Sequence, residues 1–109
     1  MKLLVTIVQD QDANKLMDRL SEEDFQFTKV SSTGGFLREG NTTLLIGVEE
    51  EKLNQLLSLI KEVCRARERY VEIPVSIAAM GGAQPFPPTK VVVGGATIFV
   101  MDVERMVSF

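Results

Sequence analysis

The sequence contains no histidine, and Cys64 is its only cysteine. A zinc site of the usual Cys/His type needs several such ligands, and Ser-His or Cys-His catalysis needs an imidazole base. Both arrangements are therefore excluded within one chain, as is a disulfide scaffold, and we expect neither a metal site nor catalytic residues. A lone thiol in a helical pattern fits a reducing compartment, where a buried cysteine behaves as a small hydrophobic residue.

Positive charge is also scarce. The sequence has 12 lysines and arginines and 15 acidic residues, which gives a net charge of −3 and a pI of about 4.9. A protein that tracks nucleic-acid phosphates carries a basic stripe. A nucleic-acid polymer is therefore not an expected partner. A small anionic ligand stays open, because backbone amides can hold phosphate without a lysine.

Long apolar runs are missing too, and none approaches the ~20 residues of a membrane-spanning helix. The apolar run at residues 3–8 ends in the polar residues 9–12, without the small-residue cleavage site of a signal peptide. We therefore expect a cytoplasmic protein without a membrane span.

The spacing of apolar residues predicts two helices. A stripe at i, i+3, i+4 and i+7 begins at Ala13, and Asp10 or Asp12 is placed to cap that helix. A second stripe follows the three glutamates at residues 49–51, whose charge suits the first turn of a helix. This second helix should run to about Arg69.

Four strands accompany these helices. Residues 3–8 are almost continuously apolar, which is typical of a strand buried on both faces, whereas residues 25–28 alternate. Residues 42–48 and 90–103 supply the other two. The order is βαββαβ, which predicts an α+β, ferredoxin-like fold: an antiparallel sheet with two helices on one face. A chain of 109 residues that is 45% apolar should form a single domain, residues 1–109.

A long loop at about residues 70–89 separates the second helix from the last strand. It contains the proline cluster of residues 85–88, and a loop of this length in a compact domain is usually functional. Residues 73–77 are a candidate for a short extra strand. Within the last strand, Gly94 and Gly95 favour a bend over direct ligand contact.

A glycine loop at about residues 31–41 joins the second and third strands. Gly34 and Gly35 let backbone amides approach a ligand closely, and Phe36 follows at once. Asn41 offers a donor and an acceptor to a base edge. Two interpretations are open: a ligand-binding loop with an aromatic that stacks on a planar group, or a plain hairpin loop whose Phe36 and Leu37 fold back onto the core.

Three separated motifs resemble one known family. TGGFLREGNTT at residues 33–43, VQDQD at 8–12 and VGGATIFVM at 93–101 occur in the same order in the cyclic-di-AMP receptor family of PII-like signalling proteins. The likeness extends from residue 1 to about residue 103. It implies a PII-like homotrimer that binds a cyclic dinucleotide, cyclic-di-AMP, in the clefts between subunits.

The resemblance also implies a set of site residues. In that family each site uses the glycine loop and adjacent strands of one chain and the last strand of the next. The matching ligand-binding positions are Thr28, Gly35, Phe36, Leu37, Asn41 and Gly47, with Phe99 from the neighbouring subunit; Gln26, Arg38 and Ser108 are further candidates. Gln26 stands where the family usually carries an arginine, and Ser108 where it often carries a glutamine.

Two helices cover one face of a four-stranded sheet, and the other face should be apolar. Such an area is larger than a soluble monomer usually exposes, so symmetric association is expected. The leading hypothesis is a non-enzymatic receptor that changes loop conformation and signals to a partner protein, with no cofactor. The alternatives are a PII-like sensor of ATP or ADP, a paralogue with weakened or lost cyclic-di-AMP binding, a structural trimer without ligand, and an enzyme that uses Asp10 and Asp12 or the glutamates at 49–51.

Overall fold

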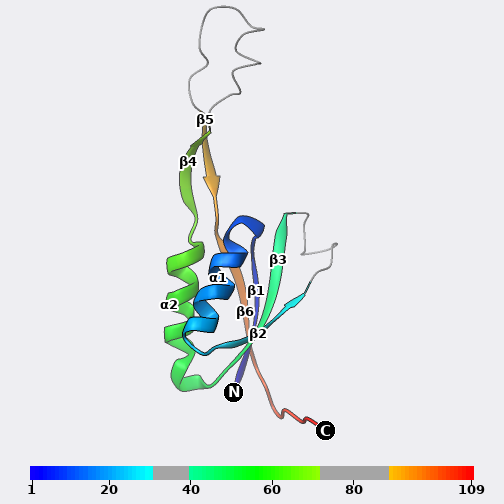
Figure 1. Cartoon of the computed structure of the whole chain (residues 1–109). Coiled ribbons are helices and arrows are strands. Elements are labelled where there is room, and N and C mark those ends of the chain that lie inside the picture. The colour runs from blue at the N-terminus through cyan, green and yellow to red at the C-terminus, as the bar shows by residue number, and fades with distance from the viewer. Residues whose placement is uncertain (31–39, 72–88) are drawn as a thin grey trace, which may run out of the picture.

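The computed structural model describes residues 1–30, 40–71 and 89–109. Two helices pack side by side against a twisted antiparallel sheet (Figure 1). In chain order the elements are β1 (Lys2–Gln9), α1 (Asp10–Glu22), β2 (Gln26–Val30), β3 (Asn41–Val48), a 3₁₀ turn (Glu50–Lys52), α2 (Leu53–Cys64), β4 (Arg67–Val71), β5 (Thr89–Val93) and β6 (Ala96–Asp102).

The main sheet has the strand order β2-β3-β1-β6, and each neighbouring pair is antiparallel. The connections β1-α1-β2 and β3-α2-β6 place both helices over the same face (Figure 1). The predicted α+β, ferredoxin-like, PII-like fold is therefore confirmed.

The core lies between the helices and this face. In β1 the buried residues alternate with half-buried ones, because successive side chains of a strand point to opposite faces. The core residues come from β1, β3, both helices and the residue before β2: Leu4, Val8, Ala13, Leu16, Leu20, Phe25, Leu44, Ile46, Val48, Leu56, Leu59, Ile60, Val63 and Cys64.

Neither of the two described α-helices lies on the second face of the sheet, and we call it the open face. Its apolar residues are Leu3, Val5, Ile7, Leu45, Phe99 and Met101, as the alternation and the strand registers establish. The expected apolar second face is therefore present. In one chain the β1 residues on this face are only half-buried, so the expectation that β1 is buried on both faces is not met by a single chain.

Two boundaries differ from the sequence-based expectations. Helix α2 ends at Cys64 rather than near Arg69, because residues 67–71 pair with residues 89–93 in a separate two-stranded sheet. Cross-strand pairing in this segment prevails over its local helix propensity. We call β4 and β5 together the arm, which extends past the end of the main sheet (Figure 1).

The last strand is divided rather than continuous from residue 90 to 103. Gly94 and Gly95 have φ of +80° and +95°, a conformation that favours glycine, and they separate β5 of the arm from β6 of the main sheet. The bend interpretation of this glycine pair is thereby confirmed. The candidate strand at 73–77 lies outside the described residues.

The capping expectation for α1 is wrong. Gln9 occupies the N-cap position without a side-chain cap hydrogen bond, and Asp10 and Asp12 lie in the first turn. Their carboxylates are engaged elsewhere: Asp10 accepts a hydrogen bond from the hydroxyl of Thr42, and Asp12 pairs with Arg67.

Candidate functional site

Five of the candidate site residues lie in the described part of the chain and share the open face. Gln26 pairs with Gly47, and Thr28 pairs with Leu45, which places these residues on that face of β2 and β3. Asn41 and Gly47 are an even number of residues apart in β3, so Asn41 lies on the same face of the sheet as Gly47. Phe99 pairs with Val5 on the far edge strand β6.

Gln26, Thr28 and Gly47 line one pocket of about 730 Å³. The other lining residues are Met1, Leu3, Phe25, Phe27, Leu45, Val103 and Met106. A Cβ added at Gly47 would meet no atom within 4 Å, so the packing of this chain does not require glycine there. The missing side chain leaves a flat patch of strand beside one amide and one hydroxyl, as contact with a planar base would require.

Asn41 lies at the other end of β3. It lines a smaller pocket of about 310 Å³ with Gln9, Gly94, Gly95 and Thr97 among its neighbours. Asn41 and Gly47 are six residues apart in the same strand, a separation of about 20 Å at the rise of an extended chain. One chain therefore presents the candidate polar groups as two clusters along the open face.

Phe99 is separated from Thr28 within its own chain. The strand registers place Thr28, Leu45, Val5 and Phe99 in one row across the sheet. Three strand spacings of about 4.8 Å put Phe99 about 14 Å from Thr28. Leu45 and Val5 fill the interval, so a site that joins both residues directly needs Phe99 from another copy of the chain.

The remaining candidates are placed differently. Ser108 is exposed in the C-terminal segment, two residues beyond Met106 of the larger pocket. Gly35, Phe36, Leu37 and Arg38 lie outside the described residues, so the two interpretations of the glycine loop stay open.

A comparison with known protein families shows to which family this chain belongs. The sequence profile of the family described as cyclic-di-AMP receptor matches residues 1–109. This chain belongs to that family. The chain is also similar to a solved structure, a functionally unknown protein from Pediococcus pentosaceus, at 42% sequence identity with a TM-score of 0.78. The match covers 99% of this chain and 96% of that one.

The larger pocket is also lined by apolar residues that were not among the predicted site residues. Met1, Leu3, Val103 and Met106 line it, and the amide of Val103 donates a hydrogen bond to the carbonyl of Met1 at 3.1 Å. The alternation of β1 could have indicated Leu3. Only the tertiary structure shows that the segment after β6 returns to the start of β1.

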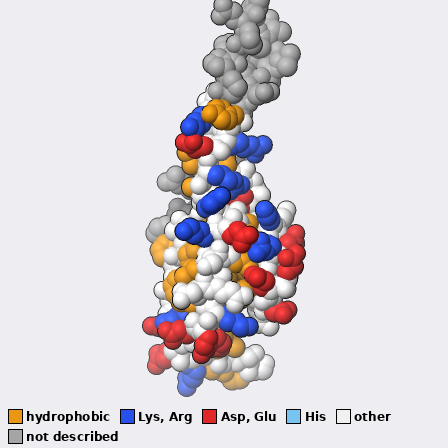
Figure 2. All heavy atoms as spheres, turned by 90° about the vertical axis from the view of Figure 1, so that its left-hand side faces the viewer, with side chains coloured by type: hydrophobic (Ala, Val, Ile, Leu, Met, Phe, Trp, Pro, Cys, Tyr) orange, Lys and Arg blue, Asp and Glu red, His pale blue; other side chains and the backbone are white. Residues whose placement is uncertain are grey.

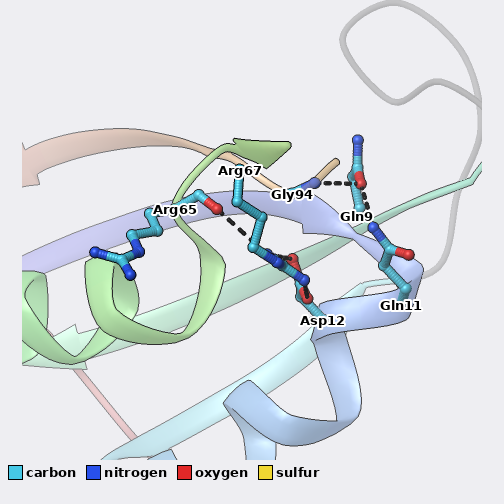
Figure 3. A network of polar contacts seen from close by, with 6 residues as sticks. All are labelled: Gln9, Gln11, Asp12, Arg65, Arg67 and Gly94. Carbon is cyan, nitrogen blue, oxygen red and sulfur yellow. Dashed lines mark hydrogen bonds and ion pairs between the residues drawn. The ribbon is translucent and has the colours of Figure 1, made fainter. Parts of the chain in front are cut away.

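A polar network connects α1 to the base of the arm (Figure 3). Arg67 Nη2 lies 2.8 Å from Asp12 Oδ1, and Nη1 lies 3.2 Å from Asp12 Oδ2. The hydrogen bond to Asp12 and its negative charge raise the pKa of Arg67. Gln9 Oε1 accepts hydrogen bonds from the amide of Gly94 at 2.7 Å and from Gln11 Nε2 at 2.8 Å.

Two further observations concern metal ligands and membrane-spanning helices among the described residues. No group of three or more histidine, cysteine, aspartate or glutamate side chains within residues 1–30, 40–71 and 89–109 is arranged to hold a metal ion. None of the helices in these ranges has the length and apolarity to cross a membrane.

Proposed function

We propose that this protein is a non-enzymatic, cytoplasmic receptor that binds cyclic-di-AMP between the subunits of a homotrimer and signals to a partner protein by a change in loop conformation. The observation that carries the proposal is the position of Phe99, which shares the open face with Thr28 but lies across the sheet from it. The membership in the cyclic-di-AMP receptor family supports the choice of ligand.

The assembly follows from the open face. Its apolar residues from β1, β3 and β6 would remain in water in a monomer, and contiguous apolar area of this kind marks an interaction surface. Packing of open faces about a three-fold axis would cover β1 and bring β6 of one copy toward β2 and β3 of the next. The pocket beside Thr28 would then gain the ring of Phe99.

Each candidate residue has a specific task in such a site. The amide of Gln26 and the hydroxyl of Thr28 hydrogen-bond the edge of one adenine or a phosphate oxygen. Gly47 lets the base lie close to the strand, and the ring of Phe99 from the neighbouring copy stacks on it, a contact worth roughly 1–3 kcal/mol. Asn41 binds the second half of the dinucleotide, at the far end of β3.

The alternative within the binding proteins is a PII-like sensor of ATP or ADP. A triphosphate favours several cations, yet none of the described residues that line the larger pocket is a lysine or an arginine. Figure 2 shows basic side chains over the arm and its base, and Arg65, Arg67, Arg69 and Lys90 belong to this region. A paralogue with weakened cyclic-di-AMP binding is the second alternative, because Gln26 lacks the charge of an arginine.

Mixing of two defective variants tests the proposal. Thr28→Ala and Phe99→Ala should each abolish the calorimetric heat of cyclic-di-AMP binding. When the two variants are unfolded and refolded together at equal amounts, random trimers should regain about a quarter of the sites, because one copy supplies Thr28 and its neighbour supplies Phe99. No recovery in trimers that contain both variants would place the two residues in the same subunit's site and contradict the proposal.

Titrations of the unmodified protein separate the alternatives. Saturable heat with cyclic-di-AMP and none with ATP supports the receptor, whereas the reverse supports the ATP sensor. Turnover of either nucleotide would indicate an enzyme. Sedimentation of the free protein as a monomer would contradict the intersubunit site.

A further inference from the structure

The first turn of α1 lies between the candidate ligand site and the arm, and it is bonded to both. On one side the amide of Asp10 donates to the carbonyl of Gly40 at 2.8 Å, and the hydroxyl of Thr42 donates to the carboxylate of Asp10. Gly40 and Thr42 flank Asn41, whose register partner in β1 is Gln9.

On the other side the same turn holds the base of the arm. The side chain of Gln9 accepts a hydrogen bond from the amide of Gly94, and Asp12 binds the guanidinium of Arg67 through both of its oxygens (Figure 3). Arg67 Nη1 also donates to the carbonyl of Arg65 at 3.2 Å. Both strands of the arm are thus attached to residues 9–12, β4 through Arg67 and β5 through Gly94.

The packing around Gly94 makes this attachment tight. A Cβ at Gly94 would lie 2.7 Å from the carbonyl oxygen of Arg65, 3.2 Å from Asp12 Oδ2 and closer still to Arg67 Nη1. The guanidinium therefore lies directly against the glycine at which β5 turns into β6. A change in the position of either group requires the other to move, because well-packed groups do not deform gradually.

We propose that residues 9–12 and the Asp12–Arg67 ion pair form a mechanical connection through which occupancy at Asn41 sets the direction of the arm. The identity of the ligand in this inference rests on the proposed function; the connection itself does not. The two neighbours of Asn41 in the chain are bonded to Asp10, and the arm is bonded to Gln9 and Asp12. A shift of Asn41 toward a ligand is therefore passed to its register partner Gln9 and from there to Gly94. The arm is then the element whose position a partner protein reads.

Thermodynamic reciprocity supplies a test that needs no ligand. If the ligand end of β3 biases the arm, a change at the arm must affect the ligand end equally. Release of the arm by Arg67→Met should therefore weaken the hydrogen bond from the Asp10 amide to Gly40. Amide hydrogen exchange measures this bond directly.

Exchange rates in the ligand-free protein should separate Arg67→Met from a matched control. We expect about fivefold faster exchange of the Asp10 and Gly94 amides in Arg67→Met, with the amides of the main sheet near Leu44 unchanged. The control Arg69→Met removes a cation two residues along the same strand, and both amides should keep their wild-type rates. If only the Gly94 amide accelerates, the ion pair merely holds the arm in place and the inference is overturned.

Arg67→Met leaves the buried carboxylate of Asp12 without a partner, so two milder variants support the measurement. Arg67→Lys keeps the charge but loses the second hydrogen bond, and Gln9→Ala removes the acceptor that Gly94 and the exposed Gln11 side chain share. Each should accelerate the Gly94 and Asp10 amides about twofold to threefold, and wild-type rates for Asp10 in both would refute the connection. Failure of the unmodified protein to bind cyclic-di-AMP would refute the proposed function alone, since these rates are measured without ligand.

Discussion

Asp12 and Arg67 lie 55 positions apart in the sequence and form a two-pronged ion pair, with distances of 2.8 Å and 3.2 Å. Only 6% of the Asp12 side chain is exposed, compared with 41% of the Arg67 side chain. The two partners therefore depend on each other unequally, since an unpaired Asp12 would be a buried charge whereas an unpaired Arg67 can turn into water.

This asymmetry predicts unequal costs of the two single substitutions. Arg67→Met should lower the urea midpoint of unfolding about twice as much as Asp12→Asn, because it leaves an uncompensated buried carboxylate. Arg69→Met serves as the control and should leave the midpoint unchanged. Equal losses for Arg67→Met and Asp12→Asn would show that Asp12 reaches water when its partner is removed.

Gln26 faces the larger pocket beside Gly47, which predicts the effect of an added charge there. Gln26→Arg should tighten cyclic-di-AMP binding by about 1–2 kcal/mol, because a guanidinium forms charge-assisted hydrogen bonds with phosphate oxygens. Isothermal calorimetry of the two proteins under the same salt conditions measures the difference. An unchanged Kd would mean that no phosphate comes within reach of residue 26.

We expect the side chain of Asn41 to contribute to ligand binding and not to the stability of the fold. Its side chain is half-buried at the end of β3, so Asn41→Ala should abolish cyclic-di-AMP binding and shift the melting temperature by no more than about 2 °C. Binding is followed by calorimetry and stability by thermal unfolding of the same sample. An unfolded variant would instead assign Asn41 to the architecture of the turn.

Cys64 predicts a pH dependence of stability. Burial of the thiol, aided by the charge of Asp12, raises its pKa to about 11. In the unfolded chain a cysteine titrates near 8.5. Between about pH 8.5 and 11 the unfolded state therefore releases a proton that the folded state retains, so stability falls as the pH rises through this range, by at most about 3.4 kcal/mol.

A comparison with Cys64→Ala isolates this titration from those of lysine and tyrosine. The difference in unfolding free energy between the two proteins should be constant below pH 8 and should change between pH 9 and 11. The native thiol should also resist alkylation at pH 8 until denaturant is added. A flat difference across the whole range would show that the thiol titrates normally.

Thr6 offers a test of the core itself. Its side chain is fully buried on the helix-covered face, and its hydroxyl has no hydrogen-bond partner among the described residues. Thr6→Val should therefore raise the unfolding free energy by about 1 kcal/mol, because it replaces an unsatisfied hydroxyl with a methyl group. The exposed Thr97→Val should change it by less than about 0.5 kcal/mol. Destabilisation by Thr6→Val would reveal a hidden partner for the hydroxyl.

The sequence determined the order of elements and the face on which residues lie. The stripe from Ala13 and the alternation in β2 depend on local spacing, which is why the βαββαβ order could be predicted. The same alternation placed Gln26 and Thr28 on one face of β2, because side-chain direction in a strand alternates regardless of what surrounds it. That Gly47 shares this face depends on the register between β2 and β3.

Only the tertiary structure decided how distant segments meet. Arg67 lies in a strand rather than at the end of α2 because residues 89–93 pair with it, and the charge partner of Asp12 comes from that strand rather than from its own helix. The separation of Phe99 from Thr28 likewise depends on the register of three strand pairs. Contacts between residues far apart in the chain follow from pairing and packing, which no local pattern encodes.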